Sequence, residues 1–281
     1  SPDTIVLHEA LQKIKKNNID NVIIEASSHG LHQNRVDYLN IKAGIFTNFS
    51  QDHLDYHKSM QSYFKAKMIL FNNLLAKRKT VISDSSIKEF NNLKKISKRK
   101  KLHIIDIITL QDKLHKDEKI NFFNEFQLKN LSMAISAAKL CNLSVKKIFN
   151  TLNKLKDVNG RLEHVRTFPN NIRVFVDFAH TPDALSKTLS ALKSRYGNNI
   201  SLVFGCGGDR DFKKRSLMGK IADKNCKKIY ITDDNPRNER PEKIRQDILK
   251  HIKNINCFNI ANRAKAIRDS IKNANPDEII L

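Results

Sequence analysis

Cysteine is scarce in this 281-residue sequence, and its four copies lie far apart. Cys141, Cys206, Cys226 and Cys257 form no C-x-x-C pair, which argues against a zinc knuckle and against a dithiol redox motif. Long apolar runs are missing as well. No stretch approaches the roughly 20 residues needed to cross a bilayer, and no charged n-region with an apolar h-region opens the chain. We therefore expect a protein of the reducing cytoplasm with no membrane partner.

Acidic residues are also few, since 29 of them face 51 basic residues and leave a formal net charge of +22. This excess favours anionic partners such as nucleotides, phosphorylated substrates or nucleic acid. The one dense basic run, residues 94–101, has no interleaved aromatic side chains of the kind that stack on bases. We interpret it as a solvated helix end, with a nucleic-acid patch as the alternative.

Internal repeats and low-complexity linkers are absent, and 40% hydrophobic content supports two medium-sized cores. Strand and helix patterns alternate along both halves, on either side of a turn-like stretch at 157–161. Strands are predicted at 21–26, 43–49, 80–83, 102–107, 173–178, 200–204, 228–232, 257–260 and 278–281, and helices at 4–16, 59–75, 87–98, 127–141, 144–155, 182–195, 215–225, 241–252 and 263–273. Such alternation indicates an α/β protein with two doubly wound, mainly parallel-sheet domains, 1–157 and 158–281. Because a helix pattern opens the chain and a strand pattern stops at its last residue, we expect a fragment lacking both ends.

One lysine falls on the apolar side of its predicted helix. At three- and four-residue spacing the stripe runs Met60, Phe64, Phe71 and Leu74, and Lys67 fills the gap in it. An unpaired buried charge is costly, so such a lysine snorkels to solvent, pairs, loses its proton or is chemically modified.

Glu25 and His53 follow two predicted strands, where ligands of parallel sheets gather. A carboxylate and an imidazole there suit a divalent cation, and Mg²⁺ would require a further anionic ligand. Carbamylation of Lys67 by carbon dioxide would turn the misplaced cation into that ligand. The alternative is that Glu25 and His53 are simply hydrogen-bonded side chains.

Three further motifs stand at predicted strand ends. The glycines of 205–211 suit an anion at a helix N-terminus or, equally, a tight turn, and Arg210 and Arg215 add cationic forks. Residues 233–237 suit a zwitterionic ligand or a helix-capping turn. Asp177 is placed to accept hydrogen bonds from ribose hydroxyls.

Seven segments taken in order resemble the Mur ligase family, and they cover nearly the whole chain. They are Glu25-Ala26-Ser27-Ser28-His29-Gly30-Leu31, Phe46-Thr47-Asn48 with Asp52-His53-Leu54-Asp55-Tyr56-His57, Ala66-Lys67, Asn159-Gly160-Arg161, Asp177-Phe178-Ala179-His180-Thr181-Pro182-Asp183-Ala184-Leu185, residues 205–211, and Asp233-Asp234-Asn235-Pro236-Arg237. The resemblance implies an ATP-dependent amide ligase of peptidoglycan synthesis. It would add meso-diaminopimelate to the D-glutamate of UDP-N-acetylmuramoyl-L-alanyl-D-glutamate through an acyl phosphate, and it would act as a cytoplasmic monomer without nucleic acid.

The resemblance also assigns roles by position. The implied Mg²⁺ ligands are Glu25, His53 and the carbamylated Lys67, and the implied catalytic residues are Lys67, His53 and Arg161. The implied contacts are Ser1, Ser27, Gln33 and Arg35 for the UDP-muramoyl dipeptide, Asn130, Arg161 and Asp177 for ATP, and Arg210, Asp234, Asn235, Pro236 and Arg237 for diaminopimelate.

The sequence departs from the family pattern in three ways. It contains no Gly-Lys-Thr phosphate loop and no Gly-Lys-Gly-His-Glu stretch, and Gln127 stands where asparagine is common. Four alternatives therefore stay open: a fragment that binds without turnover, a lysine-adding relative, a folate-polyglutamate type synthetase, and a basic nucleic-acid-binding protein.

Overall fold

The structure, a computed structural model, describes residues 2–116, 124–152, 154–156 and 158–281. Its contacts divide the chain into two compact units. The first unit combines Ser1–Phe49 with Ser59–Leu155, and the second combines Ser50–Lys58 with Lys156–Leu281. We call Ser50–Lys58 the inserted segment, because it belongs to the second unit while both of its flanks belong to the first.

The first unit is built on a parallel sheet with strand order β1-β2-β3. Short helices that periodicity does not reveal accompany the longer ones that the sequence predicts. The elements of this unit are α1 (Thr4–Lys16), α2 (Ser28–His32), β1 (Ala43–Ile45), α4 (Met60–Ile69), η1 (Leu70–Leu74), β2 (Thr80–Ser83), α5 (Phe90–Lys100), β3 (His103–Asp106), α6 (Ile108–His115), α7 (Glu125–Leu140) and α8 (Val145–Leu152).

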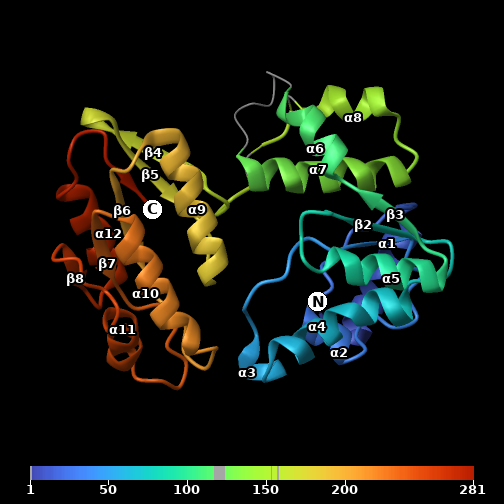
Figure 1. Cartoon of the computed structure of the whole chain (residues 1–281), viewed down its shortest axis with the longest axis horizontal. Coiled ribbons are helices and arrows are strands. Elements are labelled where there is room, and N and C mark those ends of the chain that lie inside the picture. The colour runs from blue at the N-terminus through green and yellow to red at the C-terminus, as the bar shows by residue number, and fades with distance from the viewer. Residues whose placement is uncertain (1, 117–123, 153, 157) are drawn as a thin grey trace. The chain divides into compact units, whose positions relative to one another are not determined.

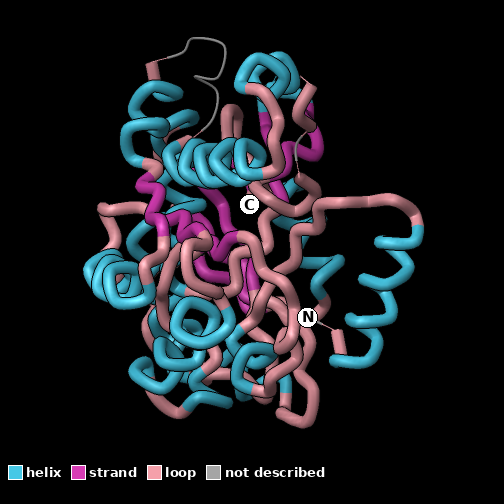
Figure 2. Tube along the Cα trace, turned by 90° about the vertical axis from the view of Figure 1, so that its right-hand side faces the viewer, coloured by secondary structure: helices cyan, strands magenta, loops and turns pink. Residues whose placement is uncertain are grey.

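The strand predicted at 21–26 is not formed. Residues 17–27, which follow α1, carry no strand and are drawn as loop in Figure 2. In the sheet of this unit β1 pairs with β2 alone, so residues 21–26 form no β-ladder with any described strand. The apolar side chains of Val22, Ile23 and Ile24 consequently lie exposed.

The single helix predicted at 59–75 is two elements. Ser59 caps α4, because its Oγ accepts from the amide of Ser62 at 3.1 Å, and η1 then continues as a π-helix. Tyr63, Ala66 and Met68 are buried, whereas Phe64 of the predicted stripe is only half-buried.

The second unit contains a six-stranded sheet of order β4-β5-β9-β6-β7-β8, parallel except for β4. The antiparallel β4 was not predicted, because most of its residues are exposed and carry no alternating apolar pattern. The elements are α3 (Leu54–His57), β4 (Glu163–Phe168), η3 (Pro169–Asn171), β5 (Ile172–Val176), α9 (Pro182–Tyr196), β6 (Ile200–Phe204), α10 (Lys213–Asn225), β7 (Lys228–Ile231), α11 (Pro241–Leu249), β8 (Cys257–Asn259), α12 (Arg263–Lys272) and β9 (Ile279–Ile280).

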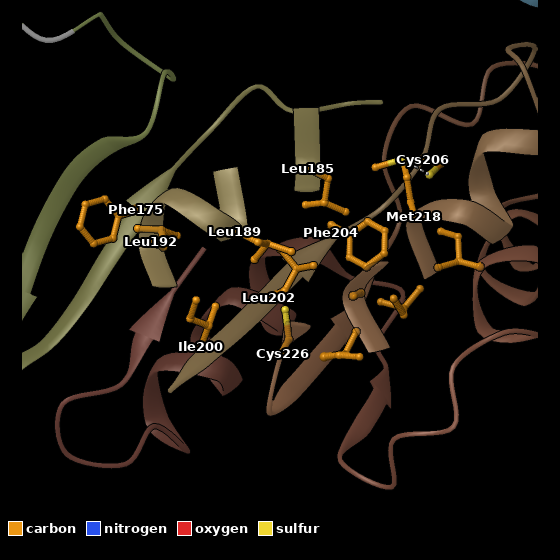
Figure 3. Packing of buried hydrophobic residues seen from close by; sticks show 14 of the residues in the cluster. Phe175, Leu185, Leu189, Leu192, Ile200, Leu202, Phe204, Cys206, Met218 and Cys226 are labelled. Carbon is orange, nitrogen blue, oxygen red and sulfur yellow. Dashed lines mark hydrogen bonds between the residues drawn. The ribbon is translucent and has the colours of Figure 1, made fainter. Parts of the chain in front are cut away.

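The strand order makes this unit doubly wound, as expected. The chain steps through β5, β6, β7 and β8 in one direction and then returns to β9, so right-handed crossovers place α9, α10 and α11 on one face and α12 on the other. Figure 1 shows α9 and α10 side by side, and both α9 and α11 contact α10. Figure 3 shows the core beneath them, where Leu189 of α9 lies beside Leu202 of β6 and Leu185 lies beside Phe204.

The last strand, β9, is held in the middle of the sheet by a buried carboxylate. Glu278, only 1% exposed, accepts from Lys228 Nζ at 2.9 Å and from the amide of Asn275 at 2.8 Å, and it also bonds Ser201. With β9 fixed there, the carboxyl ends of β5, β6 and β7 belong to one edge of the sheet. Ligands of doubly wound domains bind at that edge.

Candidate active site

Two loops meet at the carboxyl edge of the second sheet. We call residues 205–212, which follow β6, the glycine loop, and residues 232–240, which follow β7, the Asn-Pro loop. The amide of Gly208 donates to the carbonyl oxygen of Asn235 at 2.9 Å, and Arg237 Nη1 donates to the carbonyl oxygen of Gly208 at 2.8 Å. The two motifs singled out in the sequence therefore form one surface.

The glycines are explained by this close approach of two backbones. A Cβ on Gly205 would lie 2.3 Å from the carbonyl oxygen of Thr232, and one on Gly208 would lie 1.9 Å from that of Pro236. Neither distance is compatible with a side chain. The structure thus favours the packing interpretation of these glycines over a phosphate cradle.

Arg215 is not available to a ligand. Its side chain is 1% exposed, and its guanidinium binds both oxygens of Glu239, at 2.7 and 2.9 Å, and Asp247 Oδ2 at 3.2 Å. The Glu239 hydrogen bonds raise the pKa of Arg215, and the same bonds lower the pKa of Glu239. Arg215 therefore holds the two loops in place instead of serving as a free cationic fork.

Arg210 and Arg237 are exposed cations of this surface, as is Arg240 at the end of the Asn-Pro loop. Arg210 is 43% exposed, and its guanidinium lies 3.8 Å from the Asp55 carboxylate of the inserted segment. Arg237 has a left-handed backbone (φ 49°), and its amide donates to Asn235 Oδ1 at 3.2 Å. Two guanidinium groups on the same pair of loops as the exposed Asp234 carboxylate suit a ligand that carries both carboxylate and ammonium groups.

Asp177 and Arg161 are brought together at the end of β5. The Asp177 carboxylate accepts from the amide of Leu162 at 2.7 Å, from that of Ala179 at 2.8 Å and from Thr188 Oγ1 at 3.1 Å. It thereby fixes the chain beside Arg161, whose guanidinium carbon lies 4.7 Å from the centre of the exposed Phe178 ring. Three protein donors make Asp177 a structural brace at this corner.

A charged cluster that the sequence did not reveal ties the inserted segment to its unit. Asp52 Oδ2 lies 3.3 Å from His180 Nε2 and 3.4 Å from His53 Nε2, and Asp52 Oδ1 lies 3.8 Å from the buried Lys214 ammonium. Burial alone would raise the pKa of Asp52. The hydrogen bond from His180 and the charges of His53 and Lys214 outweigh burial and lower that pKa to about 2. Asp52 is separated from Lys214 by 162 positions, so no local pattern could have paired them.

In the first unit, three predicted substrate contacts surround α2. Ser27 caps this helix, because its Oγ accepts from the amide of Gly30 at 3.1 Å. Gln33 is the C-terminal cap of the same helix, and the amide of Arg35 donates to the carbonyl oxygen of Gly30 at 2.8 Å. The structure brings these three residues together. Ser1, the fourth predicted contact, lies outside the described residues.

Lys67 is half-buried between Ala66 and Met68, and its Nζ lies 5.1 Å from the centre of the Tyr63 ring. The ammonium group thus packs against an aromatic face at the edge of the core. Of the two other predicted metal ligands, Glu25 is exposed in the first unit, and His53 belongs to the second unit with a left-handed backbone (φ 57°).

Asn130 is exposed on α7 of the first unit. The helix begins with a capping box, in which the side-chain oxygen of Asn124 accepts from the backbone amide of Gln127 and that of Gln127 accepts from the backbone amide of Asn124. Gln127 therefore has a structural role. Lys129 forms an ion pair with the buried Asp84 at the end of β2. These contacts fix the helix turn that carries Asn130.

Two kinds of feature are absent from the described part of the chain. No group of three His, Cys, Asp or Glu side chains is placed there to hold a metal ion. No helix there is both long and apolar enough to span a membrane.

The chain matches two family descriptions that together cover almost all of it. Residues 1–155 match the Mur ligase middle domain, and residues 160–281 match the Mur ligase, glutamate ligase domain. The fold and the paired loops therefore belong to a known class of ligase: the chain is a member of the Mur ligase family.

Individual relatives narrow this resemblance. The chain is 39% identical to a UDP-N-acetylmuramoyl-L-alanyl-D-glutamate–2,6-diaminopimelate ligase of Rickettsia bellii, with 99% of this chain and 63% of the relative aligned. A ligase of the same name from Wigglesworthia glossinidia brevipalpis is 40% identical over 95% of this chain and 58% of its own length. The chain thus spans about three fifths of the length of these curated relatives.

Solved structures agree on the fold. A structure of UDP-N-acetylmuramoyl-L-alanyl-D-glutamate–2,6-diaminopimelate ligase superposes with a TM-score of 0.58 at 27% identity, over all of this chain and 62% of that one. Mycobacterium tuberculosis folylpolyglutamate synthase superposes with a TM-score of 0.66 at 14% identity, over 88% of this chain and 62% of that one, which is evidence of a shared fold alone.

Proposed function

We propose that this chain is the larger part of an ATP-dependent amide ligase that joins 2,6-diaminopimelate to the D-glutamate of UDP-N-acetylmuramoyl-L-alanyl-D-glutamate. The observation that carries the proposal is the pairing of the glycine loop with the Asn-Pro loop. It presents Arg210, Asp234 and Arg237 on one surface of the second unit. The names of the curated relatives support the same reaction.

The reaction has two steps. The D-glutamate carboxylate attacks the γ-phosphorus of ATP, which releases ADP and gives an acyl phosphate. The uncharged amine of diaminopimelate then attacks the acyl carbon, phosphate leaves with the bonding electron pair, and the amine loses a proton to give the amide. Arg210, Asp234 and Arg237 hold the distal amino-acid end of the acceptor, so that only the reacting amine is presented. Arg161, Asp177 and Asn130 are the residues proposed to face ATP, and Ser27, Gln33 and Arg35 those that face the UDP-linked substrate.

Mg²⁺ belongs to this proposal, with Glu25, His53 and a carbamylated Lys67 as its ligands. The chemistry of these side chains fits the ion. Glu25 supplies a carboxylate oxygen and His53 an imidazole nitrogen, and Mg²⁺ prefers oxygen ligands. The half-buried Lys67 amine becomes an anionic oxygen ligand when it takes up carbon dioxide. When bound, the ion supplies charge neutralisation at the phosphate. As a ligase of soluble substrates, the protein would work in the cytoplasm as a monomer.

The acceptor clamp is tested by calorimetric titration of the chain with meso-diaminopimelate and with L-lysine, which lacks the second carboxylate. We expect diaminopimelate to bind and Arg237→Ala to weaken binding by about tenfold or more, with L-lysine weaker by a similar factor. Equal binding of the two ligands would instead favour a lysine-adding relative. A phosphate-release assay beside the titration distinguishes turnover from a form that binds only.

The modified lysine has its own test. The protein is equilibrated with ¹³C-bicarbonate and examined by ¹³C NMR, with Lys67→Ala and the exposed neighbour Lys65→Ala as a matched pair. We expect a carbamate resonance in the protein without substitutions and in Lys65→Ala. This resonance should be absent from Lys67→Ala. A spectrum without that resonance, or one that persists in Lys67→Ala, would refute the assignment.

A further inference from the structure

Glu239 lies two positions after the proposed clamp residue Arg237, and its carboxylate joins both loops. Oε1 accepts from the amide of Asp209 at 2.6 Å and from Arg215 Nη2 at 2.7 Å, and Oε2 accepts from Arg215 Nη1 at 2.9 Å. One side chain of the Asn-Pro loop thus binds the backbone of the glycine loop and the arginine beneath it.

A second link runs in the opposite direction. Asp209 Oδ2 accepts from the amide of Asn238 at 3.2 Å and from its side-chain nitrogen at 2.8 Å. Asp209 has a left-handed backbone (φ 49°), a conformation that few residues other than glycine, Asn and Asp adopt, and the two links hold it in place. Each loop therefore contributes one acidic side chain, Asp209 or Glu239, that binds the other loop.

These links flank the two arginines of the proposed clamp. Arg210 directly follows Asp209, and Arg237 directly precedes Asn238. The conformation of each arginine backbone is therefore set by a neighbour whose partner lies on the other loop. Among the described residues, Glu239 and Asn238 bind the Asp209 backbone and side chain and Arg215, so their effect on Arg210 and Arg237 acts through the backbone.

We propose that Glu239 is a positioning residue, which with Asn238 fixes the separation of Arg210 and Arg237 before any ligand binds. The inference relies on the proposed function for the identity of the ligand, an amino acid with a carboxylate at its distal end. Pre-ordering of the loops lowers the entropy that ligand binding must overcome, so it strengthens binding without a direct contact.

The charge of Glu239 is the part that a neutral residue cannot replace. Arg215 is almost fully buried, and its remaining acceptors are Asp247 Oδ2 at 3.2 Å and the carbonyl oxygen of Gly207 at 3.4 Å. A glutamine at 239 keeps one oxygen acceptor but replaces the other carboxylate oxygen with a donor, so Arg215 loses one of its two short bonds. The bonds that remain, from Arg215 and from the amide of Asp209, are then to a neutral acceptor. Charge-assisted hydrogen bonds are roughly twice as strong as neutral ones, so Glu239→Gln should loosen both loops.

The test compares Glu239→Gln with Glu242→Gln, the same substitution at an exposed site on α11. Amide hydrogen exchange of Gly208, Asp209 and Asn238 reports the loops, calorimetry reports meso-diaminopimelate binding, and the melting temperature reports the fold. We expect Glu239→Gln to exchange these amides at least about tenfold faster and to bind about tenfold more weakly, with a melting temperature lowered by only about a few degrees, because Asp247 still pairs with the buried Arg215. Glu242→Gln should match the unmodified sequence.

Asn238→Ala provides a second variant at an exposed site, should Glu239→Gln fail to fold. It removes one of the two bonds to Asp209 and should shift exchange and binding in the same direction by a smaller factor. Unchanged exchange in whichever of the two variants folds overturns the inference, and so does faster exchange with unchanged binding. If the unmodified chain does not bind diaminopimelate, the proposed acceptor is wrong, and the exchange rates alone still decide whether Glu239 fixes the loops.

Discussion

Gly208→Ala should damage the second unit far more than the neighbouring Gly207→Ala. The new methyl group at 208 would lie 1.9 Å from the carbonyl oxygen of Pro236, whereas ordinary contact begins near 3.4 Å. The loops must therefore separate by roughly 1.5 Å, and the 2.9 Å bond from Gly208 to Asn235 cannot survive that movement. At Gly207 the nearest atom, 2.7 Å away, is the end of the flexible Arg237 side chain.

The magnitude follows from two contributions. Overpacking costs about 1–3 kcal/mol, and each lost backbone hydrogen bond adds about 1 kcal/mol, so Gly208→Ala should cost about 2–4 kcal/mol and lower the melting temperature by about 10 °C. Gly207→Ala should cost less than about 1 kcal/mol, yet it should weaken diaminopimelate binding by displacing Arg237. Circular dichroism suits the measurement, since the chain has no tryptophan for fluorescence. Equal melting temperatures for the two variants would refute the explanation of these glycines.

Two further predictions concern buried groups. Burial raises the pKa of Cys206 to about 11 and that of Cys226 to about 12. Iodoacetamide at about pH 8 should therefore label neither thiol in the native protein and both in the denatured protein. Mass spectrometry that finds either thiol labelled in the native protein would contradict this. Burial alone would raise the pKa of Asp84, but its hydrogen bonds with Lys129 and Ser86 lower that pKa by more, so the net shift is downward. Its stabilising effect should therefore be present above the unfolded pKa of about 4 and be lost as the pH falls through the lowered value. Asp84→Asn should accordingly cost about 1–3 kcal/mol at neutral pH in urea unfolding, and a cost that stays the same near pH 2 would refute the ion-pair explanation.

The second unit was the more predictable of the two. Its strands β6 and β7 are mostly apolar runs that alternate with helix patterns, and the pattern alone located Ile200–Phe204 to the residue. The first unit differed from the sequence prediction where its elements depend on neighbouring elements. The apolar run 21–26 has strand composition but no described partner, and the π-turn at Leu70–Leu74 leaves no trace in a helical pattern.

The candidate site was likewise predictable only in part. The resemblance had grouped Arg210 with residues 234–237, and the structure places the glycine loop beside the Asn-Pro loop, because topology brings the ends of neighbouring strands to one edge. Sequence could not assign Arg215, Glu239 or Asp52, since their roles depend on partners 24 to 162 positions away. Residue type was ambiguous as well: Arg215 and Arg210 look alike in sequence, but one is buried in an ion network and the other is exposed.

The assignment of Ser50–Lys58 to the second unit changes how the protein can be dissected. The polypeptide passes from one unit to the other three times, at 49/50, 58/59 and 155/156, so no single cut yields both halves intact. A recombinant first half that ends at Leu155 would retain Asp52 and Gln51 but lose Lys214, His180 and Asp211, the groups they bind. Biochemists who express the halves separately should therefore graft this nine-residue piece or coexpress both parts.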